Sequence, residues 1–222
     1  MDSYSRFRKQ NRCFSSQNSE KNNYFEILRQ TASSAMESQS ILVLGATGGS
    51  AMKAHSVTTV VSFLGAYVSA SAIVTRNVDT PIADSIPTVI QTMEKNKIKR
   101  LLALSTLSYW VEGRDVSNRK LTIYGMMPKL FAPQGNAEMV RIAETVIEKA
   151  SHLDWTIFRV PHLTDGPAEL PVWAGYAGPN HRGGLNLSRK SLARWVLGEI
   201  TQGEWVKGLP FLGVTRVTFH QS

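Results

Sequence analysis

The ten residues Ile41–Ser50, with the sequence ILVLGATGGS, constrain this chain more than any other stretch. Four apolar residues open it and form a run that suits a strand buried on both faces of a sheet. A turn containing Gly45, Gly48 and Gly49 follows at once. Glycine has no Cβ, so its backbone can turn tightly and lie against a ligand. Between a strand and a helix, such a turn can hold a pyrophosphate, although a glycine-rich turn after any buried strand has the same composition.

Composition and charge exclude several classes of protein. The chain of 222 residues carries a net charge of +8, but its basic residues are scattered, so we expect no nucleic-acid partner. No apolar run approaches the length of a membrane span, and we expect no membrane partner. Cys13 is the single cysteine, which fits a reducing compartment and a cytoplasmic location. The histidines show no metal-ligand spacing with carboxylates or the cysteine, and no metal is expected.

The first 37 residues differ from the rest of the chain. They are rich in serine, asparagine, glutamine and arginine, and they show little periodic apolar pattern. A segment of this kind buries too little apolar surface to hold a fold by itself. We therefore expect residues 1–37 to be a disordered or loosely structured extension, and residues 38–222 to form one domain.

The domain alternates between strand-like and helix-like patterns, which predicts an α/β fold. The predicted strands are Ile41–Leu44, Thr59–Leu64, Arg100–Leu104, Trp155–Val160 and Gly208–Val214, and the predicted helices are Pro81 to about Lys97, Asn136–Ala150 and a segment from Ser188 through Ile200. The strand–helix–strand unit from Thr59 to Ser105 predicts a parallel pair. Residues 107–135 are expected to cross the carboxyl end of the sheet with room for one short helix, and Pro161–Gly184 to be a loop.

These segments together resemble the atypical short-chain dehydrogenases, an NAD(P)-binding family close to NmrA-like and flavin/biliverdin-reductase-like proteins. The resemblance covers about residues 38–213 and rests on the order and spacing of several motifs: ILVLGATGG, TVVSFLGA, PIADSIPTVIQTM, KRLLALSTLSYW, LDWTIFRVPHLTDGP and LSRKSLARWVL. It implies a Rossmann-like, doubly wound parallel sheet with NADP or NAD across the carboxyl ends of its strands.

The sequence departs from that family directly after the glycine turn. Gly49 and Ser50 run almost at once into Ala51-Met52-Lys53, which resembles the end of a later helix. We infer that roughly 45 residues typical of the family are absent, including the first helix and the strand that selects NAD or NADP. The expected fold is therefore a Rossmann-like sheet truncated at one edge, with reduced cofactor affinity.

The resemblance implies a set of site residues. The cofactor-binding candidates are Gly45, Ala46, Thr47, Gly48, Gly49, Leu64, Gly65, Ser105, Thr106, Val160 and Pro161. The catalytic candidates are Ser105, which would orient a substrate carbonyl, and His162, which would donate a proton. The structural alternatives are a strand-end hydroxyl that caps a turn and a histidine that only makes a structural hydrogen bond.

The tyrosine–lysine pair of the catalytic short-chain dehydrogenases, spaced Y-x-x-x-K, is missing. Tyr124 and Lys129 are one residue too far apart, and Gly113 stands where Tyr109 would need a lysine. A general acid of that kind is therefore in doubt. The sequence favours an NAD(P)H-dependent oxidoreductase acting on a small-molecule substrate. It leaves open a non-catalytic NmrA-like dinucleotide-binding regulator and an inactive truncated variant.

Overall fold

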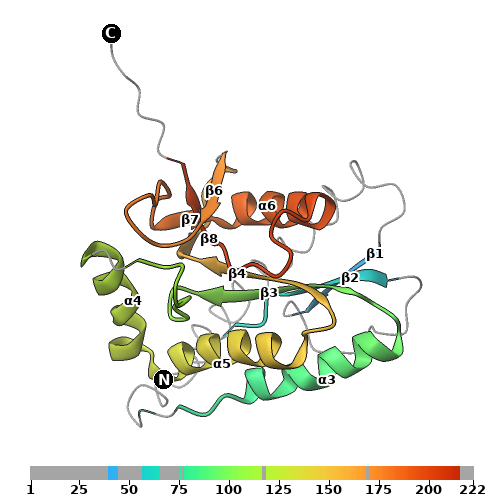
Figure 1. Cartoon of the computed structure of the whole chain (residues 1–222). Helices are drawn as coiled ribbons and strands as arrows, with labels where there is room; N and C mark the ends of the chain where they lie inside the picture. Colours follow the sequence, from blue (N-terminus) through green and yellow to red (C-terminus); the bar gives the residue numbers. More distant parts are fainter. Residues whose placement is uncertain are drawn as a thin grey trace, which may run out of the picture.

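A computed structural model of the chain describes residues 40–44, 57–65, 76, 78–116, 119–168 and 171–215. The predictions for residues 1–37 and for the glycine turn at 45–49 lie outside these ranges. The described residues form a six-stranded sheet with helices on both faces (Figure 1). The α/β, Rossmann-like fold predicted from the sequence is confirmed.

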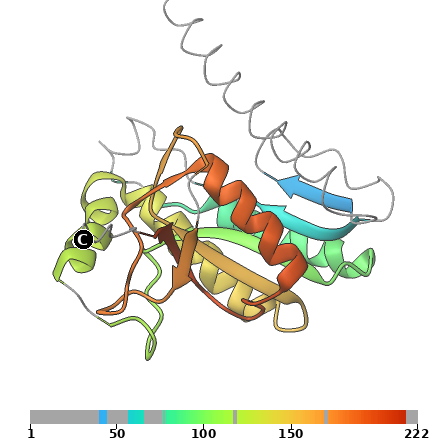
Figure 2. The ribbon, with the colours of Figure 1, turned by 90° about the horizontal axis from the view of Figure 1, so that it is seen from above.

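The sheet has the order β1-β2-β3-β4-β8-β6. Its strands are β1 (Ser40–Leu44), β2 (Val57–Ser62), β3 (Arg100–Thr106), β4 (Asp154–Val160), β8 (Phe211–Val214) and β6 (Val172–Gly175). The first five run parallel, and β6 pairs antiparallel with β8. A separate two-stranded sheet pairs β5 (His162–Thr164) with β7 (Asn186–Ser188). Among the described strands β1 lies at the edge, as Figure 2 shows, which matches the predicted truncated edge.

Helices α3 (Pro81–Lys95) and α5 (Pro133–Lys149) cover one face of the sheet, and α6 (Arg189–Gln202) covers the other (Figure 1). Two apolar clusters fill the layers between them. The first joins Ile86, Ile90, Met93, Ile142 and Val146 to one face of the sheet, and the second joins Leu192, Val196 and Ile200 to the other. In β1 Leu42 and Leu44 pack against the first cluster, and Ile41 and Val43 against the second, because successive strand residues point to opposite faces.

Helix boundaries follow local chemistry. Proline opens both α3 and α5, where its missing N–H has no intrahelical partner to lose. For this reason α5 begins at Pro133, three residues before the start predicted from the apolar pattern. Helix α6 begins as predicted, with the Ser188 hydroxyl accepting a hydrogen bond from the Ser191 N–H, and it ends at Gly203 in the left-handed conformation.

Two expectations for the connecting segments were incomplete. Residues 107–135 contain the 13-residue helix α4 (Arg119–Phe131), which is longer than the short helix expected and carries Pro128 inside it. The predicted loop Pro161–Gly184 was wrong in part, because it contains β5 and β6. These strands have three and four residues, too few to show a two-residue periodicity, and their pairing partners lie far away in the sequence.

Candidate functional site

The carboxyl ends of four neighbouring parallel strands meet at one edge of the sheet. Leu44, the last residue of β1, pairs with Ser62 at the end of β2, and Thr106 at the end of β3 pairs with Val160 at the end of β4. In open α/β sheets ligands bind outside this edge. The glycine turn Gly45–Gly49 follows β1 directly, and its conformation lies outside the described residues.

Leu64 and Gly65 follow β2, and both are half-buried. The Leu64 N–H donates a long hydrogen bond of 3.4 Å to the Ser62 hydroxyl oxygen at the end of the strand. A Cβ added to Gly65 would lie 3.5 Å from the Leu104 side chain and 3.9 Å from that of Met139. These are ordinary contact distances, so packing by itself does not require glycine here.

Ser105 and Thr106 end β3 but point to opposite faces. Ser105 is fully buried, and its hydroxyl donates a 2.8 Å hydrogen bond to the carbonyl oxygen of Met139 in α5. Thr106 is half-buried, and its hydroxyl oxygen accepts a 3.3 Å hydrogen bond from the Ser108 N–H. This geometry favours the structural alternative for Ser105, because its donor is engaged and away from solvent. Thr106 lies at the end of β3 and stays a predicted cofactor-binding residue.

Val160 and Pro161 are buried where β4 ends, and the next residue, His162, is exposed. The His162 N–H donates a hydrogen bond to the Leu185 carbonyl, which extends the chain into β5. The backbone of His162 therefore has a structural role, while its imidazole side chain is exposed to solvent. The catalytic assignment of His162 stays a prediction.

Tyr124 comes to this edge from α4, although it lacks a lysine four residues later. Its side chain hydrogen-bonds with the backbone of His162. Burial raises the pKa of Tyr124, and that hydrogen bond opposes the rise in part. The phenol therefore keeps its proton at neutral pH beside the end of β4. The only trace of this in the sequence was a tyrosine that misses the Y-x-x-x-K spacing by one residue.

A buried ion pair anchors the rim of the site. The Arg159 guanidinium, one residue before Val160, pairs through both terminal nitrogens with the Asp115 carboxylate, and neither side chain is exposed. Asp115 also accepts hydrogen bonds from the N–H groups of Val111, at 2.7 Å, and Ala177, at 2.8 Å. The pair thus fastens two rim segments to β4. Sequence reasoning missed it, because 44 residues separate its partners.

Helix N-termini at this edge are anion sites in many α/β proteins. Here the N-terminus of α3 is already occupied. The Glu138 carboxylate from α5 accepts hydrogen bonds from the N–H groups of Ile82, at 3.0 Å, and Ala83, at 2.9 Å. At the start of α6, the Ser188 hydroxyl accepts from the Ser191 N–H. Side chains of the protein therefore already engage N–H groups at both helix starts, and the glycine turn after β1 remains the candidate for the phosphates.

The described residues contain no group of three or more histidine, cysteine or acidic side chains arranged to hold a metal ion. None of the helices within them is long and apolar enough to cross a membrane.

Comparisons with known proteins agree with this geometry. The sequence profile of a family described as NAD(P)H-binding matches residues 27–202. No curated protein matches the chain. The oxidoreductase ylbE from Lactococcus lactis is similar in structure, with a TM-score of 0.55 and 14% identity over 88% of each chain. A short-chain dehydrogenase/reductase from Veillonella parvula has a TM-score of 0.50 and 15% identity over 71% of this chain.

At these identities the structural likeness shows the fold alone. The alignment spans only 63% of the length of the Veillonella protein. The family profile is the stronger finding, since its match runs from before β1 to the end of α6 and includes every candidate site residue. The chain belongs to this NAD(P)H-binding family.

Proposed function

We propose that this chain is an NAD(P)H-dependent oxidoreductase with reduced affinity for its cofactor. The observation that carries the proposal is the family match over residues 27–202, which includes the glycine turn and the four strand ends that meet at one edge. In such a protein the bound dinucleotide supplies the hydride, and the chain supplies position and electrostatics.

In this proposal, different residues at the carboxyl edge of the sheet contact different parts of the dinucleotide. Gly45–Gly49 would face the pyrophosphate, because glycine turns let backbone N–H groups reach phosphate oxygens. Leu64 and Gly65 would border the middle of the cofactor, and Thr106, Val160 and Pro161 the nicotinamide end. All of these except the glycine turn lie at adjacent strand ends, half-buried or buried.

In this proposal, the general acid that protonates the substrate is Tyr124 or His162. The phenol of Tyr124 is protonated at neutral pH and hydrogen-bonds the chain at His162, while the His162 imidazole is exposed. Ser105 is a weaker candidate, because its hydroxyl is buried and donates to Met139. A general acid must lie within hydrogen-bond reach of the group that it protonates, directly or through one water.

Turnover measurements test the proposal. With NADPH or NADH at saturating concentration, we expect slow reduction of a carbonyl, quinone or flavin acceptor. The variants Tyr124→Phe and His162→Asn identify the proton donor: loss of one donor should lower kcat by about 100-fold or more. Tyr109→Phe is the matched control, because Tyr109 is another half-buried tyrosine near the end of β3. Equal rates in all three variants would remove both residues from catalysis.

A non-catalytic dinucleotide-binding regulator is the second candidate. It is favoured by the engaged hydroxyl of Ser105 and by the absence of a lysine at the spacing that Tyr124 would need. This candidate predicts binding of NAD(P)H without reduction of any acceptor. Binding and turnover measured on one preparation therefore separate the two, and a folded chain that binds neither dinucleotide would fit the inactive variant.

A further inference from the structure

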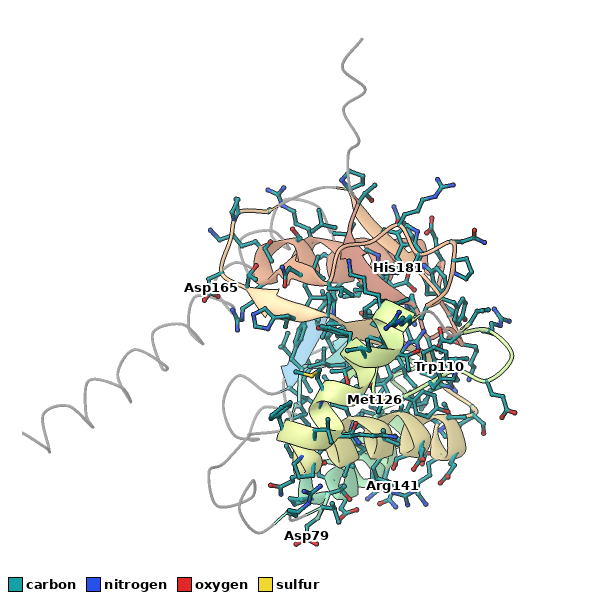
Figure 3. All side chains as sticks on the ribbon, turned by 90° about the vertical axis from the view of Figure 1, so that its left-hand side faces the viewer. Asp79, Trp110, Met126, Arg141, Asp165 and His181 are labelled. Atoms are coloured by element: carbon teal, nitrogen blue, oxygen red, sulfur yellow. The ribbon has the colours of Figure 1, made fainter. Side chains whose placement is uncertain are left out.

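Helix α4 presents an apolar face to solvent. Five large side chains on it are 47–61% exposed: Ile123, Met126, Met127, Leu130 and Phe131. Their spacing follows the pattern i, i+3, i+4, i+7 and i+8, which normally marks the side of a helix that packs against a core. Figure 3 looks onto this side of the molecule, with Met126 on the outward face of α4. We call these five residues the α4 apolar face.

The opposite side of α4 already holds the helix in the fold. Leu121 is buried with Leu107 and Phe211, and Tyr124 packs against the same cluster. A Cβ on Gly125 would lie 3.6 Å from the Leu107 carbonyl oxygen, so the helix backbone approaches β3's extension closely. The α4 apolar face is therefore surplus to the core, and burying it requires something outside the described residues.

The charged residues of α4 itself have one sign. Arg119 and Lys120 are exposed in the first turn of α4, and Lys129 is exposed near its end. Arg119 lies four residues before Ile123 and seven before Met126, which places it on the same side as the apolar residues. The sequence of α4, RKLTIYGMMPKLF, contains no acidic residue. An apolar helix face flanked, within α4, by basic residues complements an anionic and apolar surface.

We propose that α4 docks this protein onto an anionic lipid surface. A helix that lies in a membrane interface inserts one apolar face and keeps lysine and arginine at the headgroups. The five residues of the α4 apolar face are large and exposed, which suits insertion. A second copy of the chain is disfavoured as the occupant, because two α4 faces would bring six basic residues together without a carboxylate from either helix.

This docking is peripheral and needs no membrane-spanning helix. The sequence predicted no membrane partner because it lacks a long apolar run, but a surface contact does not depend on one. The proposal also stands apart from dinucleotide binding, since none of its residues is a cofactor-binding candidate. Tyr124, on the inner side of the same helix, would bring the candidate site close to the lipid.

Vesicle flotation tests this proposal with the full chain. Vesicles of phosphatidylcholine alone are compared with vesicles of about three parts phosphatidylcholine to one part phosphatidylserine. We expect the wild type to float with the anionic vesicles and not with the neutral ones. High salt should weaken this binding, because it screens the attraction between basic side chains and headgroups.

Two sets of variants assign the binding to α4. The double variant Met126→Ser/Leu130→Ser and the double variant Arg119→Gln/Lys129→Gln should each reduce the bound fraction by about tenfold. Val206→Ser is the matched control, since Val206 is an exposed apolar residue outside α4, and it should float like the wild type. All positions are exposed, so circular dichroism should show unchanged folding.

Three results would overturn the proposal. The first is a folded wild type that does not float with anionic vesicles. The second is flotation unchanged in both α4 variants, which would assign binding to basic residues elsewhere, such as those in residues 1–37. The third is a dimer in light scattering that Met126→Ser/Leu130→Ser converts to a monomer while no form floats, which would assign the face to a second copy of the chain.

Discussion

Arg159 and Asp115 form a fully buried ion pair that joins the end of β4 to the segment following β3. The Arg159 side chain also donates hydrogen bonds to the carbonyl oxygens of Leu209 and Tyr109, each at 3.0 Å. A charge without water must be matched by a partner and by further hydrogen bonds, and this pair has both. It therefore holds the rim of the candidate site in one arrangement.

The substitution Asp115→Asn tests that anchor. It keeps the shape of the side chain but leaves the guanidinium of Arg159 buried without a counter-charge. We expect the free energy of unfolding in urea to fall by about 3–5 kcal/mol. Glu144→Gln is the control, because it removes one partner of the exposed pair Arg141–Glu144 and should cost less than about 0.5 kcal/mol. Similar costs for the two variants would contradict the role given to the buried pair.

Glu138 provides a second test of long-range packing. Its carboxylate, 1% exposed, caps α3 from α5 by accepting from the backbone of Ile82 and Ala83. In Glu138→Gln one carboxylate oxygen becomes an NH₂ group, which faces an N–H donor. We expect a loss of about 1–3 kcal/mol in the free energy of unfolding. A stability equal to that of Glu144→Gln would show that the second carboxylate oxygen of Glu138 contributes little to the capping of α3.

Tyr124 predicts a signature at high pH. Burial raises its pKa above that of an exposed tyrosine, so the folded state holds the phenolic proton more tightly than the unfolded state does. The resulting stability is present below about pH 10 and is lost as pH rises through the folded pKa. Tyrosinate absorbance should show a late-titrating component that Tyr124→Phe removes.

Tyr109 must be accounted for in that titration. Its pKa is also raised, chiefly by burial and then by the negative charge of Glu144. The variant Tyr109→Phe should therefore remove a different part of the late absorbance. If Tyr124→Phe leaves the curve unchanged while Tyr109→Phe alters it, Tyr124 is not buried as described and loses its case as a proton donor.

Local patterns in the sequence predicted most of the sheet and its main helices. The run Ile41–Leu44 and the helical spacing beginning at Pro81 both appear at the expected places as β1 and α3. Such elements follow from periodicity and from the residues that start and stop them. The same logic extended to β3 would have shown that Ser105 shares a face with Leu101 and Ala103, which pack toward α5.

Contacts between distant segments could not be predicted in this way. Strand β6 pairs with β8, and the backbones of Gly183 and Gly213 approach each other closely beside this pair. The four residues of β6 carry no clear pattern of their own. The α4 apolar face is exposed, although its i, i+3, i+4, i+7 spacing would predict a face that packs against the core. In both cases the missing information is the tertiary partner, which periodicity does not contain.

Calorimetric titration of the purified chain with NADPH and NADH tests the central claim most directly. If the first helix and second strand of the family are missing, as the sequence predicts, binding should weaken by about 3–5 kcal/mol, or two to four decades. We predict saturable binding of both dinucleotides, weaker than about 0.1 mM, with little preference, and none in a folded Gly48→Val variant. Micromolar affinity with a clear preference would contradict the reduced-affinity account, and no binding by the folded wild type would contradict the proposed function.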